Sequence, residues 1–152
     1  MDYLLVTAPE NVAWILNIRG YDLAFSPIPN ARLLINSKGD IDLFSQPKKV
    51  TKIKKKISKK IKFHDEEKIE KELRNLWKKN IWVDNLSCSM HYKNLLMKRN
   101  RIIEKIDPIY FFKSIKNSTE IKNMKKRHVL DGVALTKFLF WLKKNFKKKK
   151  IT

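Results

Sequence analysis

The sequence predicts an α/β layered domain followed by one long helix. Short apolar runs typical of buried strands alternate with segments in which apolar residues recur at helical spacing. The composition is 43% hydrophobic and 11% aromatic, which is enough apolar surface for a core. A length of 152 residues suits one ordinary domain, or one domain and part of a second.

The first two elements are a strand and a helix. Residues Tyr3–Thr7 form a short continuous apolar run, which predicts a buried strand. Pro9 and Glu10 then place a proline and an acid where the first turn of a helix favours them. We expect this helix to end near Gly20, acting as the glycine that follows the C-cap.

A proline-punctuated stretch and a hairpin follow. Residues Ala24–Asn30 must be extended or turning, because each of their prolines restricts the residue before it. Two strands, Arg32–Asn36 and Asp40–Phe44, flank the turn sequence Ser37–Gly39, which is a strong short-range hairpin signal. Pro47 ends the second strand.

Residues 48–62 are predicted to form a basic helix with one narrow apolar stripe. That stripe consists of Val50, Ile53, Ile57 and Ile61 amid lysines. A membrane-surface helix needs a wide apolar face with Trp or Phe, and this stripe holds only small aliphatic residues. The pattern therefore favours a solvated helix lying on a sheet.

The alternation of strands and helices continues to residue 106. Strands are predicted at Lys62–His64, Ile81–Val83 and Arg101–Ile106. One helix begins at an Asp65 N-cap, and another spans Ser89–Arg99. This alternation indicates the α/β layered class.

A different kind of segment follows Pro108. A short helix over Ile109–Ile115 leads to Asn117, a good N-cap with Glu120 in the reciprocal place of a capping box. From there one amphipathic helix is predicted to continue to about Phe146. Because this longest apolar helix is also the last element, we expect the fold to be incomplete without further chain.

The net charge of +20 raises the question of nucleic-acid binding, since affinity for phosphates grows with the number of cations. The basic residues are 29 Lys and 6 Arg, whereas Arg is favoured for bidentate recognition of phosphates and bases. Zinc-finger, RNP-like and helix-turn-helix patterns are missing from the sequence. The composition therefore predicts salt-sensitive, non-specific adhesion and no specific nucleic-acid partner.

Other classes of site are excluded by residue counts. The single Cys88 can form no internal disulfide, and it is interpreted as a packed thiol in a reducing cytoplasm. His64, His91 and His128 show no metal-ligand spacing. The chain has no apolar run near the ~18–20 residues that span a bilayer, and its first residues resemble no signal peptide.

Two segments carry a resemblance to a known family. Residues 9–22 read PENVAWILNIRGYD, close to the PENVAWLLNIRGxD of the aminopeptidase P family, which removes an N-terminal residue preceding proline. Residues 116–142 are similar to that family's KNxxEIxxMxxAHxxDGxALxxFLxWL. The matched signature positions, for which the resemblance implies a structural role, are Asn11, Trp14, Asn17, Arg19, Gly20, Asp22, His128, Asp131 and Gly132.

The resemblance implies both a fold and an activity. Residues 1–114 would be a creatinase/prolidase N-terminal-like domain, with a mixed sheet and flanking helices. Residues 115–152 would hold the first helix of a truncated pita-bread metallopeptidase domain. Family enzymes are typically cytoplasmic homo-oligomers that act on peptides with proline in the second position. They use two divalent ions, commonly manganese.

No catalytic or metal-binding residue is assigned to this chain. In the family, the metal ligands belong to DSGGQYxxGTTD and GTGHGVG motifs, and neither motif occurs in this sequence. The acids Glu66, Glu67 and Glu70 are interpreted as a solvated helix face with lysines interleaved. Trp14 is expected in the core, and Arg19 is expected to satisfy helix C-terminal carbonyls or to pair with Asp22.

Two functions remain open at this point. The chain is either a non-catalytic part of an Xaa-Pro aminopeptidase, inactive alone, or a stand-alone creatinase-like binding or scaffold module with non-specific affinity for polyanions. An uncovered apolar helix is a liability in a monomer, which favours the first reading.

Overall fold

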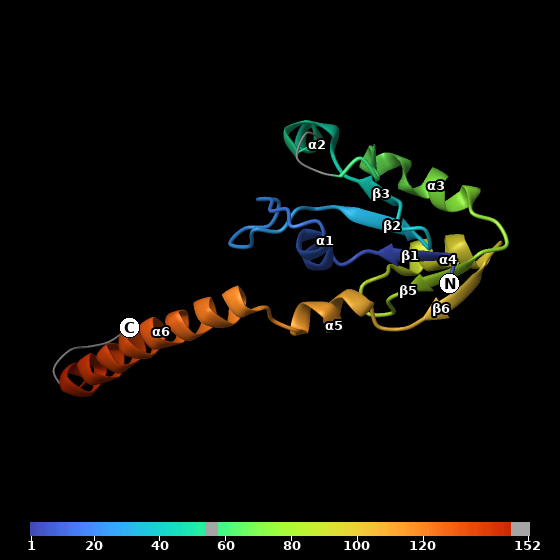
Figure 1. Cartoon of the computed structure of the whole chain (residues 1–152). Coiled ribbons are helices and arrows are strands. Elements are labelled where there is room, and N and C mark those ends of the chain that lie inside the picture. Colours follow the sequence, from blue (N-terminus) through green and yellow to red (C-terminus); the bar gives the residue numbers. More distant parts are fainter. Residues whose placement is uncertain (54–57, 147–152) are drawn as a thin grey trace. The chain divides into compact units, whose positions relative to one another are not determined.

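The computed structural model describes residues 1–53 and 58–146 (Figure 1). The chain divides into two compact units, Met1–Lys113 and Ser114–Thr152. No helix in the described ranges is both long and apolar enough to cross a membrane.

The first unit is built on a mixed sheet of six strands in the order β4-β3-β2-β1-β5-β6. β1 pairs with β2, and β2 with β3, in antiparallel register, while β1–β5, β3–β4 and β5–β6 are parallel. The strands are β1 (Tyr3–Val6), β2 (Arg32–Asn36), β3 (Ile41–Phe44), β4 (Ile61–His64), β5 (Asn80–Val83) and β6 (Arg101–Glu104).

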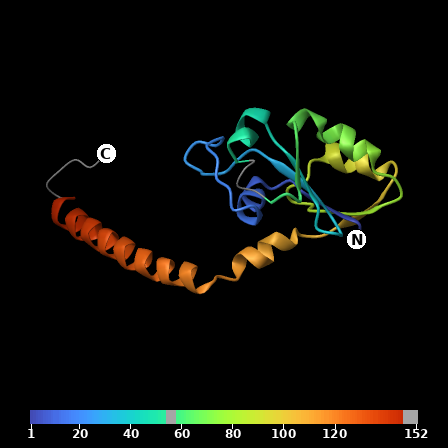
Figure 2. The ribbon, with the colours of Figure 1, turned by 45° about the horizontal axis from the view of Figure 1, so that its top comes forward.

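Helices lie on both faces of this sheet (Figure 2). They are α1 (Pro9–Ile15), α2 (Pro47–Ile53), α3 (Ile69–Asn75), which follows the 3₁₀ turn η1 (Glu66–Lys68), α4 (Met90–Met97) and α5 (Pro108–Ser114). Successive strand residues point to opposite faces, so β1 contributes to both layers. Leu5 packs with the core beneath α3 and α4, whereas Leu4 and Val6 join Val12 of α1 and Ile109 of α5. This α/β architecture confirms the predicted fold class.

Local turn chemistry was predicted correctly in several places. The turn between β2 and β3 places Gly39 at φ 84°, the left-handed conformation that the hairpin requires. Asp65 caps η1 through the backbone N–H of Glu67. Ser89 caps α4 through the N–H of Tyr92.

The end of α1 differs from the prediction. Asn17, and not Gly20, takes the left-handed conformation, with φ 49°. The N–H of Asn17 donates to the carbonyl of Trp14 at 3.1 Å, and that of Ile18 to the carbonyl of Ala13 at 3.0 Å. These two bonds form a Schellman motif, which ends the helix three residues earlier than Gly20 would.

The prediction of one helix over residues 48–62 is wrong. α2 ends at Ile53, and Ile61 belongs to β4, where it pairs with Ile41 of β3. Parallel pairing buries Ile61 against the sheet, and this tertiary contact outweighs the helical spacing of the aliphatic residues. Ile57 of the proposed stripe lies outside the described residues.

The second unit is dominated by α6 (Ser118–Asn145). Asn117 accepts a hydrogen bond from the N–H of Glu120 at 2.9 Å, and the Glu120 carboxylate accepts one from the N–H of Asn117 at 2.8 Å. The predicted capping box is therefore confirmed. No side chain of α6 is buried, and its large apolar residues, among them Phe138 and Leu139 at 53% each, are exposed.

Candidate functional site

A cleft of ≈590 Å³ opens in the first unit beside the segment that follows α1. Its floor is apolar, with Ala31, Leu43 and Val50 among the lining residues. Its charged lining residues come from two parts of the chain, Arg19 and Asp22 after α1, and Lys48 and Lys49 in α2. We call it the Arg19 cleft. Three of the signature positions, Arg19, Gly20 and Asp22, line this cleft.

Gly20 is required in this cleft by a close backbone approach. A Cβ at position 20 would lie 2.7 Å from the Cα of Pro29. The N–H of Gly20 also donates to the carbonyl of Pro27 at 3.3 Å. The absence of a side chain at Gly20 therefore allows its backbone to approach that of Pro29. This requirement for glycine differs from the predicted one, which was to end the helix.

Asp22 ties three segments together at the cleft. Its carboxylate pairs with the ammonium of Lys49 at 2.6 Å and accepts the backbone N–H of Asn30 at 2.6 Å. The hydrogen bond from Lys49, followed by that from Asn30, lowers the pKa of Asp22 below its ordinary value. The carboxylate therefore holds α2 against the loop. Lys49 is a residue of this site, although its sequence context predicted only a solvated helix.

Arg19 satisfies the carbonyls behind it and does not pair with Asp22. One guanidinium nitrogen donates to the carbonyl of Ala13 at 3.2 Å and to that of Ile18 at 2.9 Å. The side chain is otherwise exposed at the cleft. Trp14, expected in the core, is 37% exposed, because the buried residues of α1 are Asn11, Val12 and Ala13 instead.

Asn11 joins α1 to α5 and to the residue before it through side-chain hydrogen bonds. Its side-chain amide donates to Asp107 at 2.8 Å, and its carbonyl oxygen accepts from Lys113 at 2.8 Å. Burial raises the pKa of the Asp107 carboxyl above its ordinary value, while the hydrogen bonds from Ile109 and Asn11 oppose that shift. The hydroxyl of Tyr110 donates to Glu10 at 2.8 Å. The signature residue Asn11 is therefore a buried connector, and its partners carried no signal in the sequence.

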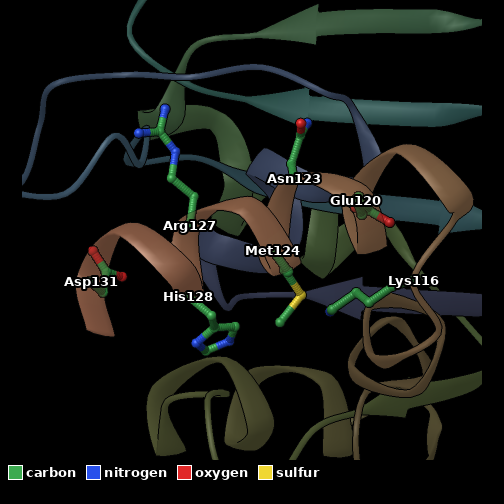
Figure 3. A pocket seen from close by; sticks show the side chains of 7 residues that line it. All are labelled: Lys116, Glu120, Asn123, Met124, Arg127, His128 and Asp131. Carbon is green, nitrogen blue, oxygen red and sulfur yellow. The ribbon is translucent and has the colours of Figure 1, made fainter. Parts of the chain in front are cut away.

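The remaining signature residues lie on α6. His128 and Asp131 line a shallow depression of ≈490 Å³ along one side of the helix, together with Glu120, Met124 and Arg127 (Figure 3). Glu120, Met124, His128 and Asp131 are spaced by three or four residues, as one helix face requires. A Cβ at position 132 would lie more than 4 Å from every atom outside the helix's own backbone.

Two histidines outside the cleft each lie beside a carboxylate. His64 lies 2.7 Å from Asp42, and His91 lies 2.9 Å from Glu70, which also pairs with Arg74 as part of a solvated face. Burial raises the pKa of Cys88 to about 11, so its thiol is protonated and unreactive at neutral pH. Within residues 1–53 and 58–146, no three His, Cys, Asp or Glu residues come close enough to hold a metal ion.

The Arg19 cleft can therefore bind and orient, but the geometry offers little for chemical catalysis. Its carboxylate and Lys49 are held in an ion pair, and Arg19 donates to two backbone carbonyls.

Curated relatives of this chain are Xaa-Pro aminopeptidases. The chain is 34% identical over 151 residues to Xaa-Pro aminopeptidase 1 of Dictyostelium discoideum, covering 97% of this chain and 24% of that protein. It is 29% identical over 147 residues to Xaa-Pro aminopeptidase ApepP of Drosophila melanogaster, covering 93% and 24%. The chain thus spans about a quarter of the length of these relatives.

Solved structures share the fold. The X-prolyl aminopeptidase from Caenorhabditis elegans, described as a cytosolic enzyme with a di-nuclear active site, superposes with a TM-score of 0.74 at 20% identity, over 98% of this chain and 25% of that one. An Xaa-Pro dipeptidase from Bacillus anthracis gives 0.57 at 17% identity, over 80% and 33%. The Creatinase/Prolidase N-terminal domain family matches residues 1–120. The chain therefore belongs to the creatinase/prolidase N-terminal domain family.

Proposed function

We propose that this chain is the non-catalytic domain of a metal-dependent Xaa-Pro aminopeptidase, followed by the first helix of its catalytic domain. The observation that carries the proposal is coverage: relatives of that activity align along nearly all of this chain, which matches only about a quarter of each of them. Residues 1–114 would form the creatinase-like domain, and residues 115–152 would open the pita-bread domain.

The exposed apolar residues of α6 support this assignment. Leu135, Phe138 and Leu139 are each more than half exposed, and a helix with so much apolar surface is stabilised by burying it. In the proposed enzyme, the rest of the catalytic domain would cover α6. The complete protein would act in the cytoplasm, as a homo-oligomer, on peptides with proline in the second position.

The metal centre of the proposed enzyme would lie outside these residues. Two divalent ions, with manganese as the expected metal, need several carboxylate and histidine ligands, and the described residues provide no such group. This domain would contribute by positioning the rim of the active site, and the Arg19 cleft is a candidate contact for it.

An activity assay on the purified 152-residue chain tests the inactive-alone part of the proposal. We expect no release of the N-terminal residue from an Xaa-Pro peptide, with or without added Mn²⁺, because the described residues hold no ligand set. A full-length family enzyme serves as the positive control. Metal-dependent turnover that co-purifies with the chain would refute this part of the proposal.

A size measurement in the source cells tests the rest. An antibody against this segment should detect a product several-fold larger than 18.2 kDa. A native product of 18.2 kDa would instead support the stand-alone binding module, and the peptidase assignment would be withdrawn.

A further inference from the structure

The first unit has a basic surface whose residues are distant in sequence from those of the Arg19 cleft. It is formed where the connection from α3 to β5 meets the connection from α4 to β6, at the start of two neighbouring parallel strands (Figure 1). The residues around a hollow of ≈530 Å³ there include Trp77, Lys78, Lys79, Lys98, Arg99 and Arg101. We call these six residues the Trp77 patch.

The five cations of this patch are exposed and are not neutralised by ion pairs. None of them takes part in any ion pair found among the described residues, although other cations nearby do, such as Lys93 with Glu104 at 2.8 Å. The charge of Lys79 acts on the Asp2 carboxylate, but that carboxylate accepts the N–H of Asn80 at 2.7 Å and forms no ion pair with a cation of the patch among the described residues. The patch therefore keeps a strong positive charge.

The backbone beneath the patch is cross-braced. The N–H of Lys78 donates to the carbonyl of Arg99 at 2.9 Å, and that of Arg101 to the carbonyl of Lys79 at 2.9 Å. Asn100 adds a side-chain bond to the carbonyl of Leu76 at 3.0 Å and accepts the N–H of Lys79 at 3.1 Å. The cations thus project from a fixed frame, so less conformational entropy is lost when they bind a ligand.

An exposed aromatic ring lies among these charges. Trp77 is 60% exposed, and the ammonium of Lys78 lies 4.3 Å from its ring centroid. A nucleobase can stack on an exposed indole ring, while surrounding Lys and Arg residues contact the phosphates on either side. An anionic membrane would need a wider apolar face beside the charges than one tryptophan and Met97 supply.

We propose that the Trp77 patch binds single-stranded nucleic acid without sequence preference. The phosphates would lie against the five cations, and one base would stack on Trp77. This activity is separate from the proposed peptidase function, and it refines the general adhesion expected from a charge of +20 by assigning it to one surface.

Fluorescence anisotropy with a labelled 20-nucleotide oligo(U) tests the cations. Reversing Lys98→Glu and Arg99→Glu should weaken binding at least tenfold at 50 mM salt and lower the log–log salt slope by about 1.4, since each phosphate contact on a single strand contributes about 0.7. The matched control, Lys59→Glu with Lys60→Glu, makes the same change in net charge at exposed positions elsewhere in the unit. It should leave affinity within about twofold, because Lys59 and Lys60 precede β4, four strands from β5 in the sheet order, which is about 19 Å at ~4.8 Å per strand, and attraction over such a distance is largely screened.

Trp77→Ala tests the stacking separately. Binding should weaken about 5- to 100-fold with the salt slope unchanged, as expected for the loss of one stacked base. Phe25→Ala, which removes a fully exposed aromatic ring from another loop, should have no effect. Circular dichroism establishes that each variant is folded, and the Lys98/Arg99 reversal, at exposed positions, tests the patch even if Trp77→Ala does not fold.

Three outcomes would overturn the proposal. Equal losses from the patch and control reversals would mean charge-driven adhesion over the whole surface. An unchanged affinity in folded Trp77→Ala would mean that no base stacks there. Binding to phosphatidylserine vesicles that depends on the same residues, without binding to oligo(U), would assign the patch to a membrane instead.

Discussion

Similar apolar residues are buried in the sheet unit and exposed in α6. In the sheet unit, Phe44 and Leu73 are completely buried, and helices cover both faces of the sheet. In α6, Phe138 and Leu139 are each 53% exposed, although the helix is well capped at Asn117. A capping box fixes where a helix begins, but it supplies no apolar contacts. The first unit is therefore stabilised by its own packing, whereas the capped helix α6 buries none of its apolar side chains.

The largest expected contrast comes from truncating one phenylalanine in each unit. Phe44→Ala should lower the free energy of unfolding by about 3–5 kcal/mol, because it removes a buried ring that stacks on His64 at 5.1 Å. Phe138→Ala should change it by about 0.5 kcal/mol or less. Urea titrations measure both free-energy changes, and equal m-values in the variants and the unsubstituted chain make the comparison valid. Similar losses in the two variants would show that α6 is already covered in the isolated chain.

A pair of glycine substitutions gives the next contrast. Gly20→Ala should cost about 1–3 kcal/mol, because the new methyl group meets the backbone of Pro29 at 2.7 Å. Gly132→Ala meets nothing within 4 Å and should raise helix stability by about 0.5–1 kcal/mol. Urea unfolding reports the first effect, and the far-ultraviolet circular dichroism of thermal fraying reports the second. A harmless Gly20→Ala would contradict the close contact at the Arg19 cleft.

The end of α1 offers a smaller effect. Asn17→Ala should cost about 1 kcal/mol, because alanine tolerates φ 49° less well than asparagine does. Asn17→Gly should be nearly neutral, since glycine adopts this conformation freely. Equilibrium unfolding of the two variants side by side separates backbone conformation from loss of the side chain. Equal losses in both would assign the effect to the side chain and reject the Schellman geometry.

The smallest expected effect is the pH dependence that Asp22 contributes. Its pKa in the folded protein lies below the ordinary 3.8, so its stabilising effect is fully present above about pH 4 and is lost as the pH falls through the folded-state pKa. Asp22→Asn should therefore be less stable than the native chain at pH 6, and the difference should vanish at the lowest pH. Lys49→Met should reduce the same dependence. A difference that persists at low pH would show that the Lys49 ion pair contributes little.

Elements set by local chemistry could be read from the sequence. The turn at Gly39, the cap at Ser89 and the capping box at Asn117 each depend on side chains within a few residues of one another. The alternation of strands and helices likewise predicted the α/β layers. Arg19 and Gly20, for which the sequence predicted only structural roles, also line the cleft.

The features that the sequence could not supply all depend on long-range contacts. Ile61 has helical spacing from Val50, yet it lies in β4, because pairing with β3 buries it. Lys49 looked like one of many solvated lysines until the fold placed it against Asp22. Asn11 donates a hydrogen bond to Asp107, which is 96 residues away in the sequence.

The sequence by itself thus determined the class of the domain, the caps and turns, and the family signature. Only the tertiary structure decided which lysine pairs with Asp22, why Gly20 must be glycine, and where five cations gather around Trp77. The physical reason is that propensity and capping act within about one helical turn, whereas burial and charge pairing depend on residues that only the folded chain brings together.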